Sequence, residues 1–264
     1  MKIHFSNVNF SSSSGPNSFA NRLAEEFTKR GHEIVGERSD YEIFLCFIEP
    51  ASVPREGSKF IHRLDGIWFK PEQFKTHNKH IKWAYENCDK VIWQSNFDKK
   101  MTCHHWGKPK SGVVIHNGIK KTTFDNLHDE IKKIKTNFDR IFVCSAFWHR
   151  QKRLKENIVF YQKNRNKDWL LHFAWLDHCP NVVVESLSMG CPVICTTSGG
   201  TKEIVQNNGI ILNEKKQYSY ELVDYDNPYT LDIEKIDLEK INVNSDYLDI
   251  ELVCDKYEKV FKWD

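Results

Sequence analysis

The sequence lacks the features that mark several large classes of protein. None of its apolar runs approaches the roughly 20 residues that a membrane-spanning helix needs. Its 12 glycines form no GxG, the core of the usual dinucleotide-binding fingerprint. Its eight cysteines form no CxxC pair, and neither Cys103-His104-His105 nor His178-Cys179 has the spaced partner pair of a zinc site. We therefore expect no membrane span, no dinucleotide fold of the usual kind and no bound metal.

Two further absences bear on where the protein works. Residues Met1–Phe5 turn polar at once, without the apolar stretch of a signal peptide. Cysteines such as Cys46 and Cys195 lie inside apolar runs, as buried free thiols do in a reducing compartment. Both observations predict a cytoplasmic protein.

The charge is nearly balanced, at a formal +2, so the composition does not favour a nucleic-acid partner. The two signs are unevenly distributed, however. The segment 221–264 holds 13 acidic and 5 basic side chains, which leaves 33 basic and 23 acidic side chains, a net of +10, on the segment 1–220. A basic body of this kind suits an anionic small ligand.

Short apolar runs alternate with amphipathic stretches, which predicts βα units and an α/β fold with parallel sheets. With 264 residues, of which 40% are hydrophobic, the chain can form one large domain or two small ones. We expect strands at 3–10, 34–35, 43–48, 90–94, 113–115, 141–144, 169–175, 192–196 and 209–212. We expect helices at 19–30, 72–87, 98–106, 152–163, 180–189 and 252–261.

A polar, lysine-rich stretch over 121–139 is typical of a linker between two domains. We therefore expect an N-terminal domain over 1–120 and a shorter second domain over 140–215. An acidic tail over 216–264 would follow and end in a closing helix.

A serine-rich loop with Gly15 and Pro16 separates the first expected strand from the first expected helix. Glycine lets a backbone approach a ligand closely, and the helix N-terminus presents unpaired N–H groups and the positive end of the helix dipole. This combination suits a phosphate. A plain turn between a strand and a helix would have the same residues, so the loop alone is a weak indication.

A cationic cluster, Trp148-His149-Arg150-Gln151-Lys152-Arg153-Leu154, directly follows an expected strand. The carboxyl ends of parallel strands are where α/β folds bind anionic ligands. Lysine neutralises a phosphate as a point charge, and arginine can hold one through two hydrogen bonds. The alternative is a solvated helix start, but cations at a helix N-terminus oppose its dipole. The cluster therefore favours a phosphate-bearing ligand.

A third segment begins at Asp177. Pro180 suits the first turn of a helix, on which Asn181 and Glu185 share one polar face. The pair Gly199-Gly200 leaves backbone N–H groups free to meet a ligand. In the alternative interpretation Asp177 only marks a helix start and Glu185 lies on the surface.

Two stretches of this segment resemble a known family. Residues Glu185-Ser-Leu-Ser-Met-Gly-Cys-Pro-Val-Ile194 and Ser198-Gly-Gly-Thr-Lys-Glu-Ile-Val205 are similar to the C-terminal signature of retaining GT-B glycosyltransferases of family 4, or glycosyl transferases group 1. That family pairs two acidic residues eight positions apart, which match Asp177 and Glu185. The cluster around Lys152 resembles the family's diphosphate-binding segment, and with smaller matches in the first half the resemblance covers about residues 1–212.

The resemblance implies a GT-B fold, in which two Rossmann-like domains face each other across a cleft. The cleft would hold a nucleoside-diphosphate sugar as co-substrate, with no cofactor. The enzyme would be a metal-independent transferase of the hexosyltransferase type, acting in polysaccharide biosynthesis with retention of anomeric configuration. Its acceptor would be a glycan, a lipid-linked glycan or a protein.

The resemblance also assigns roles to individual side chains. Lys152, with Arg150 or Arg153, would neutralise the diphosphate as it leaves. Asp177 would contact sugar hydroxyls, and Glu185 would contact the nucleoside ribose. Lys152 and Asp177 are accordingly candidate catalytic residues.

Other residues would complete the site that the resemblance implies. The donor would also meet the loop at Gly15, the pair Gly199-Gly200 and the backbone of Pro180, Asn181 and Val182. His62 and Asp65 lie where the family often places acceptor-side or catalytic groups. These two side chains are the remaining catalytic candidates.

The chain departs from the family in one respect. Several strands and helices normally separate the diphosphate-binding lysine from the first acidic residue, whereas only the segment 153–176 lies between Lys152 and Asp177. This segment allows one helix and one strand. We therefore expect a truncated second domain, from which the stretch that frames the nucleotide base is missing.

Alternatives stay open at this point. The shortened second half would also suit a catalytically silent protein that binds a sugar nucleotide or a glycan, or a partner subunit of another glycosyltransferase. A GT-B epimerase or phosphorylase is a weaker alternative, since no cofactor lysine or epimerase acid–base set is recognisable. A peripheral membrane contact is suggested by Trp68, Phe69, Lys70, Phe74 and Lys75, although a solvated amphipathic segment would have the same residues.

Overall fold

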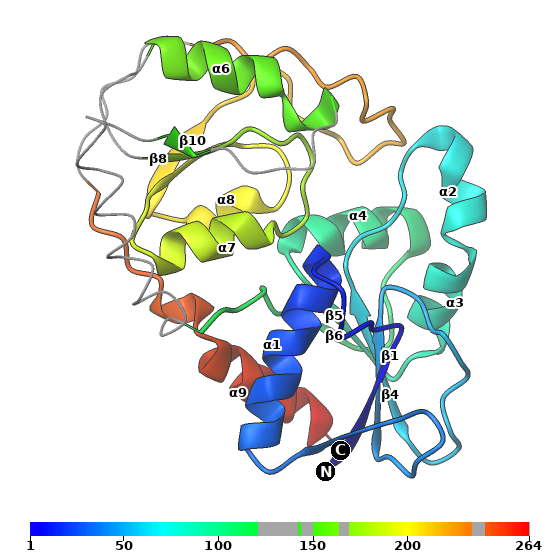
Figure 1. Ribbon diagram of the computed structural model, residues 1–264. Helices are drawn as coiled ribbons and strands as arrows, with labels where there is room; N and C mark the ends of the chain where they lie inside the picture. Colours follow the sequence, from blue (N-terminus) through cyan, green and yellow to red (C-terminus); the bar gives the residue numbers. More distant parts are fainter. Residues whose placement is uncertain (121–141, 144–149, 164–168, 234–240, 264) are drawn as a thin grey trace. The chain divides into compact units, whose positions relative to one another are not determined.

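The computed structural model describes residues 1–120, 142–143, 150–163, 169–233 and 241–263 (Figure 1). The chain divides into two compact units. Unit 1 comprises Met1–Gly118, Tyr220–Val223 and Tyr247–Asp264, and unit 2 comprises Ile119–Ser219 and Asp224–Asp246. Each unit is built on its own parallel sheet, which confirms the predicted α/β class. The expected linker at 121–139, together with Trp148 and His149, lies outside the described residues.

Unit 1 contains a sheet of six parallel strands in the order β2-β1-β3-β4-β5-β6 among the described residues. The strands are β1 (Lys2–Ser6), β2 (Glu33–Val35), β3 (Ile43–Phe47), β4 (Lys59–Leu64), β5 (Lys90–Trp93) and β6 (Gly112–Val114). All five residues of β3 are buried, as the continuous apolar sequence IFLCF predicts for a strand covered on both faces. Because β1 pairs with both β2 and β3, the strand order reverses at β1, and ligands commonly bind beyond the carboxyl ends of strands at such a point.

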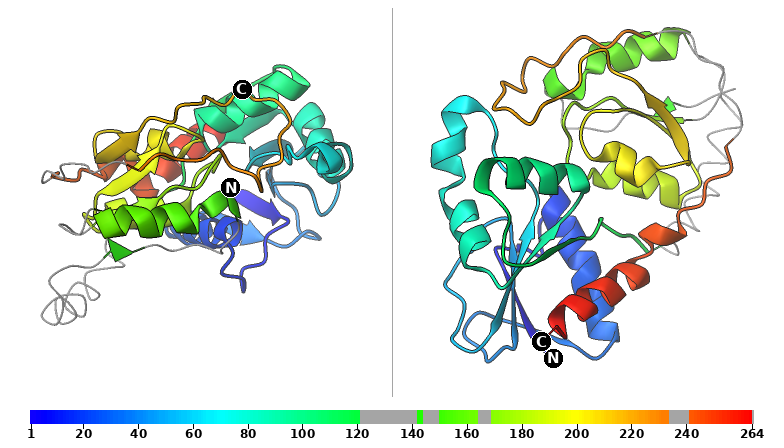
Figure 2. Two further views of the ribbon diagram at one scale, coloured as in Figure 1. Left: turned by 90° about the horizontal axis from the view of Figure 1, so that it is seen from above. Right: turned by 180° about the vertical axis from the view of Figure 1, so that it is seen from behind.

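Helices cover both faces of this sheet. On one face α1 (Gly15–Lys29) packs beside α9 (Ile250–Phe261), although the two helices come from opposite ends of the sequence (Figures 1 and 2). The rings of Phe27 and Phe261 lie 5.4 Å apart in this layer, and Tyr257 is completely buried between α1 and the sheet. Phe60 and Trp83, 6.0 Å apart, place α3 (Lys79–Asn87) on the opposite face. The other described helices of unit 1 are α2 (Pro71–His77) and α4 (Asn96–Trp106).

Unit 2 contains a sheet of four parallel strands in the order β10-β9-β8-β7 among the described residues. The strands are β7 (Phe142–Val143), β8 (Trp169–His172), β9 (Val193–Thr196) and β10 (Gly209–Leu212). The close packing of β9 and β10 requires glycine at position 209. A Cβ atom at Gly209 would lie 1.9 Å from the carbonyl oxygen of Val193, closer than atoms of neighbouring strands can approach.

The described residues of unit 2 form the helices α6 (Leu154–Lys163), α7 (Asn181–Ser188) and α8 (Thr201–Val205). Helix α6 lies on one face of the sheet, and α7 and α8 lie on the other (Figures 1 and 2). Phe160 of α6 packs with Leu171 and Ile194 on one face. Val205 of α8 lies on the other face, over Gly209, and α7 contacts α8 there. The strand order runs in one direction from β7 to β10, so right-handed connections would place all three helices on one face. Because α6 lies on the face opposite to α7 and α8, the β7–α6–β8 unit departs from the right-handed rule.

Several predicted boundaries differ from the structure for local reasons. The helix expected at 72–87 is two helices, because the buried side chain of Asn78 bonds to the backbone of Trp68 (2.6 and 2.9 Å) and to the carbonyl of Phe74 (2.9 Å). The first strand ends at Ser6, where Asn7 takes a positive φ of 62°. The closing helix begins at Ile250, two residues earlier than expected, because the carboxylate of Asp249 caps it.

Candidate active site

The candidate donor-side residues gather beyond the carboxyl ends of the unit 2 strands. Lys152 ends the short 3-10 turn η2 (Arg150–Lys152) that precedes α6. Asp177 lies in the loop between β8 and α7, and Gly199-Gly200 lies in the loop between β9 and α8. Parallel strands end at one edge of a sheet, which explains why segments far apart in sequence meet here.

Lys152 and Asp177 form a direct ion pair. The Nζ atom of Lys152 donates to Oδ2 of Asp177 over 2.5 Å, and these side chains are 20% and 18% exposed. Nε2 of His172, at the end of β8, lies 3.5 Å from the same carboxylate oxygen. His172 is not among the residues expected from the sequence, although a single polar residue inside the apolar run Leu170–Ala174 was a signal for it.

The partners of Asp177 determine its charge. Burial by itself would raise the pKa of this carboxyl, but the Lys152 ammonium and His172 outweigh burial and hold the pKa well below its ordinary value. Asp177 is therefore ionised at any pH at which an enzyme works. An ionised carboxylate only accepts hydrogen bonds, and a sugar hydroxyl can donate one to it.

The Gly199-Gly200 pair holds the Asp177 loop in place. Gly199 has a φ of +78°, and a Cβ atom there would lie 2.6 Å from the carbonyl oxygen of Asp177. The backbone N–H of Gly200 donates to that same oxygen over 2.7 Å. The sequence suggested that both N–H groups face a ligand, but the N–H of Gly200 is used inside the protein.

Helix α7 presents its first turn just after Asp177. Pro180 precedes it in an extended conformation, and Val183, Val184 and Leu187 anchor it in the core. Asn181 and Val182 open the helix, whose first N–H groups have no partner within an α-helix. Glu185 lies one turn later and is partly exposed.

The two arginines next to Lys152 have different environments. Arg150 is exposed and lies at the beginning of η2. Arg153 is 2% exposed, and its guanidinium donates to both carboxylate oxygens of Glu214 over 2.8 and 3.1 Å. Of the two arginines that the sequence offered as partners of Lys152, only Arg150 therefore faces solvent.

In unit 1 the candidate His62 lies in the interior. Its side chain is completely buried on β4, and Nε2 lies 2.7 Å from the carbonyl oxygen of Ile48. Burial lowers the pKa of His62 to about 4, so the ring is neutral at physiological pH and donates its Nε2–H to that carbonyl. The structure gives this side chain no solvent-facing surface.

Asp65 belongs to a polar network at the carboxyl ends of β4, β5 and β6. Arg63 donates to Oδ1 of Asp65 and, over 2.7 Å, to Oδ1 of Asn117. Asn117 in turn donates to Gln94 over 3.2 Å. Oδ2 of Asp65 is buried without a hydrogen-bond partner among the described residues. Arg63 is not among the residues expected from the sequence, and the signal for it was a charged residue two positions before Asp65 in a strand.

The Gly15 loop is exposed and held by its own side chains. Asn17 accepts from the N–H of Asn9 over 2.9 Å and donates to Ser14 over 2.8 Å. Gly15 begins α1, and Ser14 precedes it without a side-chain capping bond. The loop lies directly after β1, the strand at which the order of the unit 1 sheet reverses.

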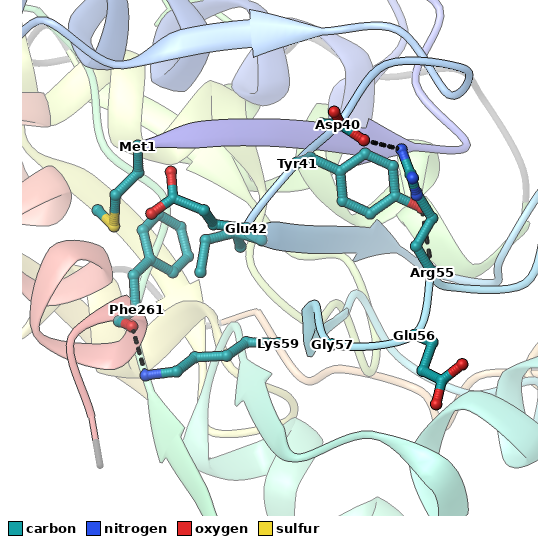
Figure 3. A pocket seen from close by; sticks show the side chains of 10 residues that line it. Met1, Asp40, Tyr41, Glu42, Arg55, Glu56, Gly57, Lys59 and Phe261 are labelled. Carbon is teal, nitrogen blue, oxygen red and sulfur yellow. Dashed lines mark hydrogen bonds and ion pairs between the residues drawn. The ribbon is translucent and has the colours of Figure 1, made fainter.

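A pocket of about 460 Å³ lies at the opposite, amino-terminal edge of the unit 1 sheet (Figure 3). It is lined by Met1, Asp40, Tyr41, Glu42, Ile43, Arg55, Glu56, Gly57, Lys59 and Phe261. Its cations have local partners, since Arg55 pairs with Asp40 over 2.6 Å and Lys59 donates to the carbonyl of Phe261 over 3.1 Å. Because ligands of α/β sheets bind at the carboxyl edge, this pocket is not the candidate active site.

The described residues contain neither a metal-binding cluster nor a membrane-spanning helix. No group of three or more His, Cys, Asp and Glu side chains in the described part of the chain is arranged to hold a metal ion. No helix in the same residues is long and apolar enough to cross a membrane.

Comparison with known proteins identifies the fold. No protein-family model matches the sequence, and no curated protein matches it. Solved structures do match. HepE of Anabaena in complex with UDP superposes with a TM-score of 0.66 at 12% identity, over 98% of this chain and 99% of that one. AviGT4, a glycosyltransferase involved in avilamycin A biosynthesis, has a TM-score of 0.62 at 13% identity, over 99% and 97% of the two chains.

A glycosyltransferase from Rickettsia africae has a TM-score of 0.60 at 14% identity, over 99% of this chain and 97% of that one. At identities this low the likeness establishes architecture and not activity. The chain has the α/β fold with parallel sheets of the GT-B structures that it matches.

Proposed function

We propose that the protein is a retaining, hexosyltransferase-type glycosyltransferase of the family 4 kind, which takes its sugar from a nucleoside-diphosphate sugar. The observation that carries the proposal is the Lys152 ammonium, held 2.5 Å from Asp177 at the carboxyl edge of the unit 2 sheet. An ammonium has three donors, so Lys152 can keep its bond to Asp177 and still meet a diphosphate oxygen. HepE has been solved with UDP and with UDP-glucose, which makes uridine nucleotides the first donors to test here.

In the proposed reaction, the bond between the anomeric carbon and the diphosphate breaks while the acceptor oxygen forms a bond to that carbon on the same face of the sugar, and the proton of the acceptor hydroxyl passes to the departing diphosphate. Lys152 and Arg150 stabilise the negative charge that develops on the diphosphate. Preorganised charge at a leaving group is among the largest contributions to such catalysis. Asp177 binds sugar hydroxyls as an ionised acceptor, and Glu185 binds the ribose.

The other donor contacts come from backbone. At the first turn of α7, which directly follows Pro180, the backbone N–H groups of Asn181 and Val182 and the positive end of the helix dipole would bind a phosphate or the sugar. In unit 1, the Gly15 loop would bind a phosphate, and Asp65 would be a carboxylate on the acceptor side. His62 has no substrate contact in this proposal, since its side chain is completely buried.

We propose further that the reaction needs no metal ion and takes place in the cytoplasm. The sugar is transferred to a glycan, lipid-linked or protein acceptor in polysaccharide biosynthesis. Chelator should leave the rate unchanged, which tests the first point directly. The anomeric configuration of the product, read by NMR, tests retention.

The central test compares Lys152→Ala and Glu185→Ala with Lys155→Ala, a control at an exposed position of α6. The purified full chain is incubated with UDP-, GDP- and ADP-sugars, and release of the nucleoside diphosphate is followed with and without glycan acceptors. We expect Lys152→Ala to lose about 100- to 1000-fold in rate, because one preorganised charge at the leaving group is removed. Lys155→Ala should match the wild type.

Two outcomes would count against the proposal. Full activity in both site variants would remove Lys152 and Glu185 from the site. Thermal stabilisation of the wild type by a sugar nucleotide, without turnover on any acceptor, would favour the silent binding protein instead.

A further inference from the structure

Arg153 sits at an unusual turn between η2 and α6. Its φ is +52°, a left-handed conformation that few residues other than glycine adopt and that costs free energy unless the surroundings impose it. Its N–H donates to the carbonyl of Arg150 over 2.9 Å, which closes η2. Something outside the turn must therefore hold residue 153 in this conformation.

The Arg153 side chain supplies that restraint. Its guanidinium donates to Oε1 and Oε2 of Glu214 over 2.8 and 3.1 Å, and to the carbonyl of Tyr229 over 2.7 Å. The side chains of Arg153 and Glu214 are 0% and 3% exposed. A bidentate arginine–carboxylate pair has a fixed geometry, and burial protects it from competing water.

A second contact restrains the same turn. The side-chain amide of Asn157, which is 3% exposed, donates to the carbonyls of Lys152 and Arg153 over 3.1 and 2.8 Å. The backbone on both sides of the Lys152–Arg153 peptide bond is thus held from the protein interior. Lys152 is the residue whose ammonium reaches Asp177 from this turn.

Two adjacent cations therefore differ in surroundings. Lys152 is partly exposed, whereas Arg153 is buried against a carboxylate 61 positions later in the chain. A buried ion pair is expensive to desolvate, and in several proteins buried polar or ionic groups serve to specify one conformation. The conformation specified here is the turn that carries Lys152.

We propose that Arg153 and Glu214 are positioning residues for Lys152, and that their buried ion pair holds the left-handed turn from which Lys152 reaches Asp177. The effect on turnover rests on the proposed function, in which Lys152 meets the donor diphosphate. The placement of Lys152 against Asp177 does not depend on that function and can be measured separately.

The test uses two double variants of the full chain. Arg153→Ala with Glu214→Gln removes the pair and leaves a side chain that disfavours positive φ. Arg153→Gly with Glu214→Gln removes the same pair, but glycine adopts the left-handed conformation of this turn at little cost. Neither variant leaves an unpaired buried charge, which would threaten folding. Lys215→Gln, at an exposed residue next to Glu214, is the control.

The first readout is the ¹³C resonance of the Asp177 carboxyl followed against pH. In the wild type it should stay ionised through the whole folded range. In the alanine double variant we expect it to titrate nearer the ordinary aspartate value of ~3.9, because Lys152 has moved away. The glycine double variant should return most of the way to wild-type behaviour, and Lys215→Gln should not differ from wild type.

The second readout is kcat and KM for nucleoside diphosphate release. We expect the alanine double variant to lose about 100-fold in kcat, the effect of misplacing one catalytic group by about 1 Å, with a smaller change in KM. The glycine double variant should recover most of this loss. Absence of turnover in the wild type would reject the proposed function and leave the carboxyl titration as the test of positioning.

Either of two results would overturn the inference. One is a folded alanine double variant in which Asp177 titrates as in the wild type. The other is equal impairment of the alanine and glycine variants, which would mean that the left-handed turn does not place Lys152. If the alanine variant does not fold by circular dichroism, Glu214→Asp replaces it. That variant keeps the charge, draws the carboxylate back, and should shift the Asp177 titration in the same direction.

Discussion

The Nζ atom of Lys152 lies 2.5 Å from Oδ2 of Asp177, although the two residues are 25 positions apart in the chain. In its described residues, 153–163 and 169–176, the intervening segment contains one helix, α6, and one strand, β8. Lys152 precedes α6 and Asp177 follows β8, so the ion pair joins the two ends of this helix–strand unit.

Asp177 should make stability sensitive to acid. Burial raises its pKa, but Lys152 and His172 lower it further, so the pKa in the folded state lies below the unfolded value of ~3.9. A depressed carboxyl pKa stabilises the folded state fully above the unfolded pKa, and this stabilisation is lost as the pH falls below about 4. We expect the free energy of unfolding of the wild type to exceed that of Asp177→Asn most above pH ~5, and the difference to shrink on acidification.

Urea unfolding at a series of pH values measures this difference. Asp232→Asn is the matched control, because the Asp232 carboxylate pairs with Lys215 on the surface and is 55% exposed. Its effect should stay within about 1 kcal/mol at every pH. A difference between the wild type and Asp177→Asn that is constant from pH ~6 to ~3 would show that Asp177 is not held by Lys152.

Gly199 and Gly190 allow a matched comparison of two glycine-to-alanine variants. Both have a positive φ, +78° and +74°, so alanine is strained at either position by about 1–2 kcal/mol. Only at Gly199 would the new Cβ meet the protein, 2.6 Å from the carbonyl oxygen of Asp177, whereas nothing lies within 4 Å at Gly190. We expect Gly199→Ala to cost about 1–3 kcal/mol more than Gly190→Ala, since backbone must move.

The two glycine variants are compared by urea unfolding, with the Asp177 carboxyl resonance as a second measurement. Only Gly199→Ala should change that resonance. Equal losses of stability, with an unchanged resonance in both variants, would mean that the Gly199 loop does not support Asp177.

His62 should contribute a separate dependence on pH. Its pKa falls from an ordinary ~6.5 to about 4 through burial, so between these values the unfolded chain binds more protons than the folded protein. Stability therefore rises with pH from about 4 to about 6.5 and is constant above that range. We expect the rise to be about 3 kcal/mol for the wild type and to be nearly absent in His62→Gln.

Exposed His80 is the control for this experiment, because His80→Gln should keep the wild-type dependence on pH. His62→Gln can still donate a hydrogen bond to the carbonyl of Ile48, which limits the loss of stability at neutral pH. An unaltered slope between pH ~4 and ~6.5 in His62→Gln would mean that the histidine is not buried in its neutral form.

The alternation of strands and helices was readable from the sequence because it depends on local periodicity. Apolar runs such as 43–48 and 209–212 correspond to β3 and β10, and the pattern at 252–261 to most of α9. The break at Asn78 was not readable, because it depends on hydrogen bonds from that side chain to the backbone of Trp68, ten positions away. Local periodicity offered no reason for a helix to stop there.

The chemistry of the candidate site was partly readable. The cationic cluster after a strand predicted an anionic ligand, and the family resemblance placed Lys152 and Asp177 in one site. The structure brings these two side chains into an ion pair. The different environments of neighbouring residues were not readable from the sequence. Lys152 and Arg153 carry the same charge, and only the position of Glu214 shows that one is buried and the other is not.

Local sequence therefore specifies the order of strands and helices, and which polar residues follow the strands, because both depend on residues close together in the chain. Folding specifies which of those polar residues are in contact and which are buried. Burial of His62, the pairing of Arg153 with Glu214 and the contact of Gly200 with Asp177 all depend on segments that only folding brings together. Solvent exposure and long-range contacts determine the protonation state and the conformational freedom of a side chain, and the local sequence specifies neither of these surroundings.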